Sequence, residues 1–172
     1  MRTLYLLRHA KSASREEALE DHERPLSPRG RRAAKAMALH FRELAADPAL
    51  VLCSSAVRTR QTLDLLLPGF ATTPIIATER GLYLAGAESM LARLRRVEDS
   101  IERVLLLGHN PGLQTLALAL AKKAPSNLRK PLARKFPTAA LATYRIESGW
   151  SELAPGTARL VAYETPAGLG VD

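Results

Sequence analysis

Short apolar runs that alternate with helix-like segments constrain the fold of this chain more than any other feature. The first run, Leu4–Leu7, is apolar throughout, as in a strand that is covered on both faces. Alternating strands and helices favour βαβ units and a largely parallel sheet with helices on both sides. We therefore predict a three-layer α/β/α fold. The expected strands are residues 4–7, 49–53, 74–77, 102–107, 139–146 and 158–164, with the last two antiparallel at an edge.

The expected helices have recognisable ends and apolar side chains at helical spacing. Ser27 is a suitable N-cap and Pro28 a suitable first residue for a helix that runs to about residue 45. The segment 124–136 is basic and contains Pro125 and Pro131, so we predict that it is mostly loop. The other helices are expected at residues 56–67, 87–97 and 111–122.

Length and composition favour a globular domain. The chain has 172 residues, of which 47% are hydrophobic, so we expect one domain over residues 1–172 with a loose tail at 166–172. Its formal net charge of +8 is compatible with nucleic acid, acidic proteins or phosphorylated ligands as partners. Because aromatic residues make up only 5% and the basic residues are scattered, nucleic acid is the least favoured of these.

The single cysteine, Cys53, allows no internal disulfide, which is typical of a reducing compartment. No apolar run approaches the roughly 20 residues that a membrane helix needs. The expectation is a cytoplasmic protein that does not bind membranes, with a monomer as the favoured state.

Basic and nucleophilic side chains follow three of the expected strands. Arg8 and His9 follow the first strand, Arg58 lies just after the second, and His109 follows the fourth. Because parallel strands end at one edge of a sheet, these four side chains are expected to converge. Helix N-termini after residues 55 and 110 add free N–H groups that favour anions. The pattern predicts a phosphate site.

Each of these side chains has a predicted role in phosphoryl transfer. His9 is the candidate nucleophile and needs a fixed acceptor, such as a backbone carbonyl, at its other ring nitrogen. Arg8 and Arg58 are expected to clamp the phosphoryl oxygens, and His109 to stabilise transition-state charge if it is protonated. The candidate contacts around them are Lys11, Ser14 and Asn110.

Simpler interpretations exist for each residue taken alone. An arginine at a strand end is often only a solvated charge, and a lone histidine is more often structural than catalytic. His22 and His40 are given that structural interpretation. The joint pattern at three strand ends is what favours catalysis for the other four residues.

Four segments together resemble the histidine phosphatase superfamily, whose fold is phosphoglycerate mutase-like. Residues 6–12 (LLRHAKS) look like the signature with the nucleophilic histidine, residues 54–62 (SSAVRTRQT) like the second arginine motif, and residues 108–111 (GHNP) like the second histidine motif. Residues 21–30 (DHERPLSPRG) are similar to the small SixA-like branch, whose members act as phosphohistidine phosphatases. The resemblance extends from residue 2 to about residue 163 and implies an enzyme without metal or cofactor.

The sequence departs from larger relatives in one respect, because it has no insertion that would carry a general acid. The candidates are Asp21, Glu79 and Glu88, and each is more simply a surface or helix-start carboxylate. A missing acid favours a substrate with a good leaving group, such as a protein-borne phosphohistidine. A small sugar or nucleotide phosphomonoester is the alternative substrate, and a non-catalytic phosphate-binding module is a second alternative.

Other classes fit the sequence less well. A cysteine phosphatase needs five residues between its cysteine and arginine, whereas Cys53 and Arg58 are separated by four. No compact set of histidines and carboxylates indicates a metal site. Binding to RNA or a membrane surface through residues 29–35 and 129–135 is a further class, although the first of these segments is more simply an exposed helix face.

Overall fold

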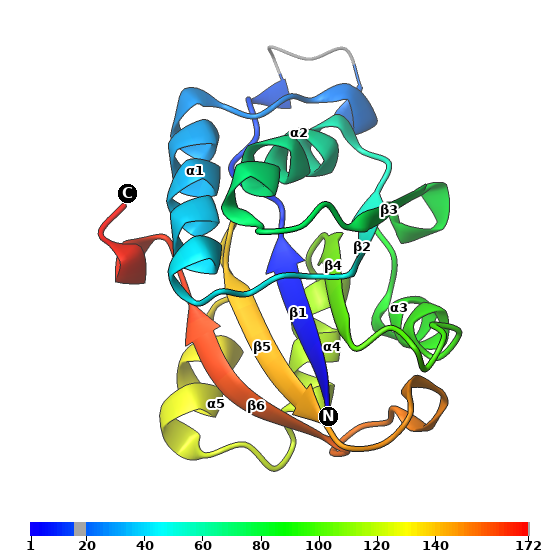
Figure 1. Ribbon diagram of the computed structural model, residues 1–172. Helices are drawn as coiled ribbons and strands as arrows, with labels where there is room; N and C mark the ends of the chain where they lie inside the picture. The colour runs from blue at the N-terminus through cyan, green and yellow to red at the C-terminus, as the bar shows by residue number, and fades with distance from the viewer. Residues whose placement is uncertain (16–19, 172) are drawn as a thin grey trace.

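The computed structural model describes residues 1–15 and 20–171. A twisted six-stranded sheet runs through the centre of the molecule, with helices on both faces (Figure 1). Its strands are β1 (Arg2–Arg8), β2 (Leu50–Ser54), β3 (Ile75–Glu79), β4 (Arg103–Gly108), β5 (Leu141–Ile146) and β6 (Ala158–Glu164). The helices are α1 (Pro28–Glu43), α2 (Val57–Leu66), α3 (Ala87–Leu94), α4 (Gly112–Leu120) and α5 (Ser126–Arg134).

The sheet is mostly parallel, as predicted. Its strand order is β3-β2-β4-β1-β5-β6. The pairs β2–β3, β2–β4 and β1–β4 are parallel, whereas β5 is antiparallel to both β1 and β6. The expected antiparallel pair at one edge is therefore confirmed. β1, β4 and β2 are neighbours that point the same way, so their carboxyl ends lie together.

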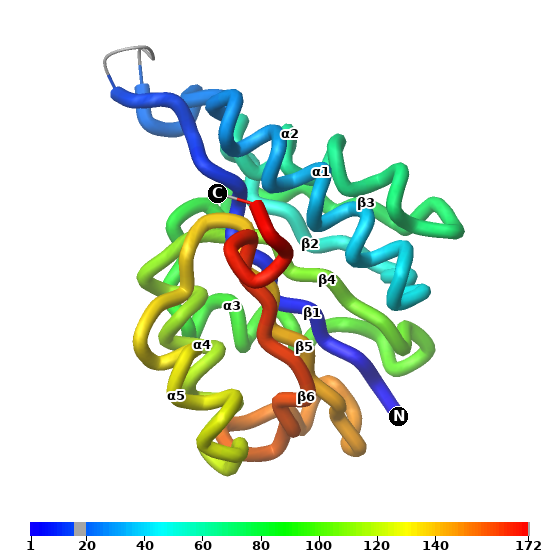
Figure 2. Tube along the Cα trace, turned by 90° about the vertical axis from the view of Figure 1, so that its left-hand side faces the viewer, coloured from blue at the N-terminus to red at the C-terminus, as the bar shows by residue number. Residues whose placement is uncertain are grey.

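Alternate side chains of β1 pack into two hydrophobic clusters, one on each face of the sheet. Leu4 and Leu6 pack toward α3, α4 and α5, whereas Tyr5 and Leu7 pack toward α1 and α2. Figure 2 shows the helices α1 and α2 on one side of the sheet and α3, α4 and α5 on the other. This arrangement confirms the three-layer prediction and explains why the first strand is apolar on both faces.

β3 is apolar for a different reason. It is an edge strand, and its residues Ile75 and Ile76 are 63% and 42% exposed. The apolar pair therefore reflects β propensity rather than burial. The strand also extends two residues beyond the predicted end at residue 77.

α1 begins where the sequence indicates. The Ser27 hydroxyl accepts a hydrogen bond from the Gly30 amide over 3.0 Å, and Pro28 is the first helical residue. A Cβ atom at Gly30 would lie 2.0 Å from the Lys11 carbonyl oxygen. The glycine thus lets the start of α1 pack directly against the segment that follows β1.

The prediction of a loop over residues 124–136 is wrong, because this segment contains α5. Pro125 precedes the helix, a position that proline tolerates because the first amides of a helix have no partner within it. Pro131 lies inside the helix, where a broken backbone hydrogen bond is expected to be costly. Leu132 is fully buried in the core beside α4, and this burial offsets that cost.

The tail is also more regular than expected. Ala167–Leu169 forms a short 3-10 helix after β6. Backbone hydrogen bonds from Leu169 to Thr165 and Pro166 close this turn, and Leu169 packs against the core beneath α1 and α2. Within the described residues, no helix is long and apolar enough to cross a membrane.

Candidate active site

The carboxyl ends of β1, β2 and β4 bring the predicted residues into one cavity of about 440 Å³. Arg8 lies opposite Gly108 in the β1–β4 register, so His9 and His109 leave adjacent strands side by side. Their rings are 5.2 Å apart, centroid to centroid. The residues that line the cavity include Arg8, His9, Lys11, Asp21, Arg58, His109 and Asn110.

His9 is held with one ring nitrogen fixed and the other available. Its Nδ1 lies 2.7 Å from the carbonyl oxygen of Ala10. A carbonyl only accepts, so Nδ1 carries the proton and Nε2 keeps its lone pair. Thr62 positions this turn, since its hydroxyl accepts a hydrogen bond from the Ala10 amide over 3.0 Å. The predicted backbone acceptor is therefore present.

Burial keeps His9 neutral. The residue is 6% exposed. Burial lowers the pKa of His9 to about 3, with smaller contributions in the same direction from His109 and the nearby arginines. The hydrogen bond to Ala10 opposes this shift and does not cancel it. A neutral imidazole with a free Nε2 is the form that acts as a nucleophile.

His109 lies between Arg58 and Ser54. Arg58 Nη2 donates to Nδ1 of His109 over 3.3 Å, and because a guanidinium only donates, Nε2 carries the proton and donates to Ser54 Oγ over 2.7 Å. Burial and the adjacent Arg58 charge lower the pKa of His109 to about 3. The structure therefore holds a neutral His109, which differs from the protonated donor considered for this position.

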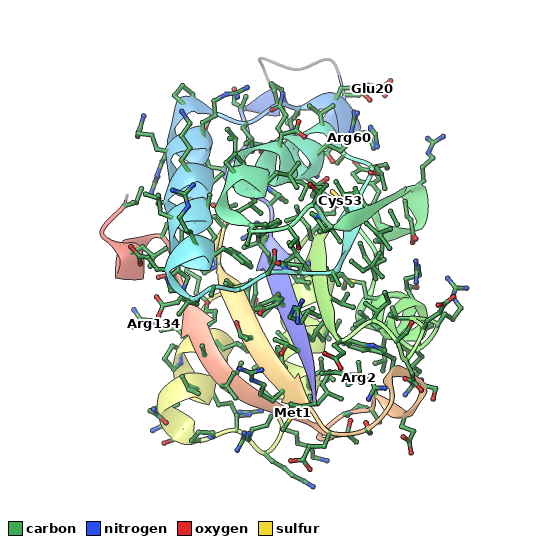
Figure 3. The ribbon with its side chains drawn as sticks, viewed as in Figure 1. Met1, Arg2, Glu20, Cys53, Arg60 and Arg134 are labelled. Carbon is green, nitrogen blue, oxygen red and sulfur yellow. The ribbon has the colours of Figure 1, made fainter. Side chains whose placement is uncertain are left out.

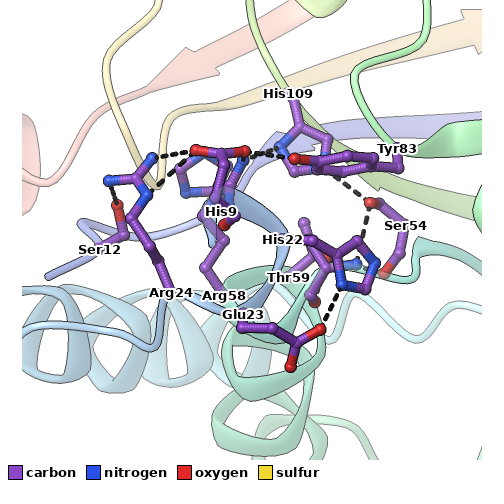
Figure 4. A network of polar contacts seen from close by, with 12 residues as sticks. His9, Ser12, His22, Glu23, Arg24, Ser54, Arg58, Thr59, Tyr83 and His109 are labelled. Carbon is purple, nitrogen blue, oxygen red and sulfur yellow. Dashed lines mark hydrogen bonds and ion pairs between the residues drawn. The ribbon is translucent and has the colours of Figure 1, made fainter. Parts of the chain in front are cut away.

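Arg58 is held by a carboxylate that the sequence offered as a general acid. The residue is 2% exposed. Its Nη1 donates to the backbone carbonyl of Asp21 over 2.7 Å, and its Nη2 donates to Asp21 Oδ2 over 3.1 Å. Figure 4 shows Arg58 beside His9 and His109. Asp21 thus fixes the direction of the Arg58 guanidinium from two of its oxygens.

Asp21 is ionised rather than poised to release a proton. Partial burial raises the pKa of its carboxyl, but hydrogen bonds from Tyr83, Arg24 and Arg58 outweigh that effect and hold the pKa far below its usual range. Arg24 donates to Oδ1 over 2.9 Å through Nη2, and the Tyr83 hydroxyl donates to Oδ2. A carboxylate in this state accepts hydrogen bonds and positions its partners.

The other two carboxylates lie outside the cavity. Glu79, at the end of β3, pairs with Arg93 over 2.8 Å. Glu88 is exposed in the first turn of α3. Neither lines the cavity that contains His9, so the structure brings neither candidate acid to the reacting groups.

Two of the three further candidate phosphate contacts line the cavity, and one does not. Lys11 is exposed at the rim, and Ser14 is exposed and does not line the cavity. Asn110 faces the cavity, but its Nδ2 donates to the Phe136 carbonyl over 3.0 Å and its Oδ1 accepts from the Gln114 amide. Both polar atoms of the Asn110 amide are therefore already paired within the protein, which leaves less capacity for a ligand.

Tyr83 and Arg24 are the participants that sequence reasoning missed. Tyr83 packs edge-on against His109, with ring centroids 5.4 Å apart, and against His22 at 4.8 Å. Arg24 also donates to Ser12 Oγ over 2.9 Å. Arg24 lies in the segment 21–30 that resembles the SixA-like branch, so this segment contains a usable signal for it. Nothing in the sequence marked Tyr83.

The two residues given a structural interpretation differ in position. His22 lies near the site, where its ring makes hydrogen-bond contacts with Ser55 Oγ at 2.9 Å and with Glu23 at 2.8 Å. These contacts secure the short segment that carries Asp21. His40 lies in the last turn of α1.

The charge of the cavity suits an anion. Five of its lining residues are cationic and one, Asp21, is an ionised carboxylate; the cationic set is Arg8, Lys11, Arg15, Arg24 and Arg58. α4 begins three residues after His109, but its Leu113 and Gln114 amides already donate to the His109 carbonyl and to Asn110 Oδ1, so the cationic side chains carry the charge of the cavity. A Cβ atom at Gly112 would lie 2.0 Å from the Ala85 carbonyl oxygen, so glycine permits the close approach of this turn.

Two rival chemistries lack a site in the described part of the chain. Cys53 is fully buried in the core beneath α1 and α2, and burial raises the pKa of its thiol to about 12. Figure 3 shows it among side chains packed close to α2, which fits the interpretation of Cys53 as a buried strand residue. Residues 1–15 and 20–171 contain no group of three or more histidine, cysteine or carboxylate side chains that could hold a metal ion.

Comparison with known proteins identifies the same family that the sequence motifs resemble. Residues 4–82 match the family described as the histidine phosphatase superfamily (branch 1). An uncharacterised protein of Mycobacterium tuberculosis H37Rv is 36% identical over 165 residues, which span 93% of this chain and 99% of that protein.

Solved structures extend this likeness over the whole fold. A protein of Nakamurella multipartitia named "putative phosphohistidine phosphatase SixA" is 32% identical, with a TM-score of 0.84 over 96% of both chains. A protein of the same name from Agrobacterium tumefaciens is 28% identical, with a TM-score of 0.82 over 96% of this chain and 98% of its own. The phosphoglycerate mutase-like fold is thereby confirmed, and the chain belongs to the SixA-like branch of the histidine phosphatase superfamily.

Proposed function

We propose that this protein is a phosphatase that removes the phosphoryl group from protein-bound phosphohistidine through a covalent intermediate on His9. One observation carries the proposal: the Nδ1 hydrogen bond to Ala10 leaves Nε2 of a neutral, buried His9 as a free lone pair inside a cationic cavity. That combination is a nucleophile placed beside groups that stabilise a transferring phosphoryl group.

The reaction follows in two displacements. Nε2 of His9 forms a bond to phosphorus while the bond to the leaving nitrogen of the substrate breaks, and the departing imidazole takes a proton from solvent. Arg8 and Arg58 balance the charge on the phosphoryl oxygens. Water then attacks phosphorus, inorganic phosphate leaves, and His9 returns to its neutral form.

His109 is proposed to change its protonation state during this cycle. A phosphoryl dianion in the cavity raises the pKa of a neighbouring imidazole, because it stabilises the cationic form. Its Nδ1 accepts from Arg58 Nη2 in the absence of a ligand, so this contact must give way to a phosphoryl oxygen when Nδ1 gains a proton. A protonated His109 then donates to the oxygen that gains charge in the transition state.

The substrate class follows from the state of the carboxylates. An alkoxide leaving group needs a proton donor, and Asp21 is held ionised by Tyr83, Arg24 and Arg58. An imidazole leaving group can take its proton from solvent near neutral pH, so a phosphoramidate needs no proton donor in the cavity. A small phosphomonoester is the second candidate, favoured only in that the same five cationic residues bind any phosphoryl group.

The test is to follow radiolabelled phosphate from a phosphohistidine peptide onto the protein. We expect label on His9 that survives denaturation at alkaline pH and is lost in acid, as expected of a phosphoramidate. The His9→Ala variant should carry no label and show no turnover, while His40→Ala serves as the matched control for loss of a histidine outside the cavity.

Two results would count against the proposal. Binding of phosphate without label or turnover would indicate a phosphate-binding module. A kcat/KM that is much higher for sugar phosphates than for phosphohistidine would assign the protein to small phosphomonoesters instead.

A further inference from the structure

A second groove lies beside the catalytic cavity and communicates with it. The groove has a volume of about 650 Å³ and is formed by the start of α1, the end of α5 and the segment after β6. Lys11 and Thr138 line both the groove and the catalytic cavity. Figure 2 shows the C-terminal segment between α1 and α5. Thr165, Pro166, Ala167 and Val171 of this segment line the groove. A ligand in the groove can therefore be continuous with a phosphoryl group at His9.

The groove has an unbalanced charge. Five cationic residues line it, and none of the described lining residues is a carboxylate; the cationic set is Lys11, Arg29, Lys130, Arg134 and Lys135. All five are exposed, and none forms an ion pair with another residue of the described part of the chain. Like charges around one concave surface focus a positive potential and attract anions.

The groove also has an apolar surface, and one of the side chains that form it is held in place. Pro131, Pro137 and Tyr163 contribute apolar surface between the cationic side chains. Tyr163 is fixed, because its hydroxyl donates to the Lys135 carbonyl and its ring packs on Phe136 with centroids 5.6 Å apart. A compact polyphosphate would use the charges and leave this apolar surface without contacts.

We propose that the groove binds an acidic polypeptide segment that flanks the phosphohistidine of a protein substrate. This inference rests on the proposed phosphohistidine phosphatase activity. Carboxylate side chains of such a segment pair with Lys130, Arg134 and their neighbours, while its apolar atoms lie on the proline and tyrosine surface. The groove then selects the substrate by sequence context, and the cavity at His9 supplies the chemistry.

The experiment compares substrates that differ only beside the phosphohistidine. Synthetic peptides with a single histidine, phosphorylated by phosphoramidate, carry glutamate, glutamine or lysine in otherwise identical flanks on both sides. Free phosphohistidine is the reference without flanks. We expect kcat/KM to be roughly tenfold or more higher for the glutamate peptide than for the glutamine peptide, mainly through KM, and lowest for the lysine peptide.

The variant K130E/R134E tests the groove itself. Both side chains are exposed on α5, so the substitutions leave the core intact. We expect the preference for the glutamate peptide to disappear, while turnover of free phosphohistidine stays within twofold. The matched control K123E/R129E makes the same change in net charge at exposed positions that do not line the groove, and it should keep the preference.

The outcomes separate this inference from the proposed function. No turnover of any phosphohistidine substrate, free or in a peptide, would overturn the activity. Turnover of all three peptides at one rate, or an equal loss of preference in both double variants, would contradict the proposed role of the groove. Neither result would contradict the phosphatase activity. Inhibition by a short RNA that K130E/R134E abolishes, without a preference among the peptides, would assign the groove to nucleic acid and overturn the proposal.

Discussion

The guanidinium of Arg58 donates a hydrogen bond to Nδ1 of His109 over 3.3 Å. Oδ2 of Asp21 accepts from the same guanidinium nitrogen, and Ser54 holds the other nitrogen of the imidazole. The two side chains come from different elements, yet each fixes the orientation of the other. The pair thus enters the reaction with both orientations fixed, although Nδ1 of His109 must exchange Arg58 for a phosphoryl oxygen before it can act as a donor.

Removal of either member of this pair should affect the chemical step. We expect Arg58→Ala and His109→Ala each to lower kcat on the order of a hundredfold or more, the scale of losing one transition-state donor. Steady-state kinetics on a phosphohistidine peptide measures this. Arg60→Ala is the control, because Arg60 is exposed on the same helix and lies outside the cavity. Near-normal kcat in the His109 variant would remove that residue from the mechanism.

Asp21→Asn separates a positioning role from general acid catalysis. The substitution removes the charge that orients Arg58, so we expect kcat to fall on the order of tenfold to a hundredfold. As a positioning residue, Asp21 should affect p-nitrophenyl phosphate and an alkyl phosphate equally. A loss confined to the alkyl phosphate, whose leaving group needs a proton, would show instead that Asp21 donates one.

The two buried histidines should make stability depend on pH. Each has a pKa of about 3 in the folded protein, below the value of 6.5 expected when exposed. The unfolded chain therefore binds more protons between pH 6.5 and pH 3, and the free energy of unfolding falls as pH decreases through that range. Each histidine contributes up to about 1.4 kcal/mol per pH unit.

Urea unfolding at pH 7 and pH 5 measures this effect. The His109→Gln variant should lose less stability than the unmodified protein over that interval, since one titrating group is absent. An identical pH dependence in both proteins would indicate that His109 is not neutral in the folded state.

Gly112→Ala should destabilise the protein, because its Cβ atom would lie 2.0 Å from the backbone oxygen of Ala85. Backbone atoms yield little, and we expect a loss of about 1–3 kcal/mol together with reduced activity, since α4 starts just after His109. Thermal and urea unfolding provide the measurement. Gly81→Ala is the matched control, because no atom beyond its chain neighbours lies within 4 Å of its Cβ position.

The main elements of the fold could be predicted because burial on both faces leaves a plain signal in the sequence. Leu4–Leu7 and residues 104–107 are apolar throughout because they lie between two helix layers. α5 escaped prediction because Pro131 argues locally against a helix, whereas the burial of Leu132 depends on tertiary contacts that no local rule contains. The short helix at Ala167–Leu169 depends in the same way on packing against distant elements.

The four central site residues could also be predicted, since strand ends in a parallel sheet converge by geometry. The residues that position these four side chains could not be predicted. Tyr83 reaches Asp21 from a position 62 residues away, and no spacing rule links the two. The ionised state of Asp21 depends on that contact, which is why the sequence left it as a candidate acid.

α5 joins the core chiefly through one fully buried side chain, Leu132, while its exposed face carries Lys130 and Arg134. Substitutions on that face cost little folding free energy and leave the strand ends untouched. If the groove selects substrates as proposed, recognition and reaction belong to separable parts of the chain, and new client proteins can be acquired by exchanging a few side chains on one peripheral helix while turnover is retained.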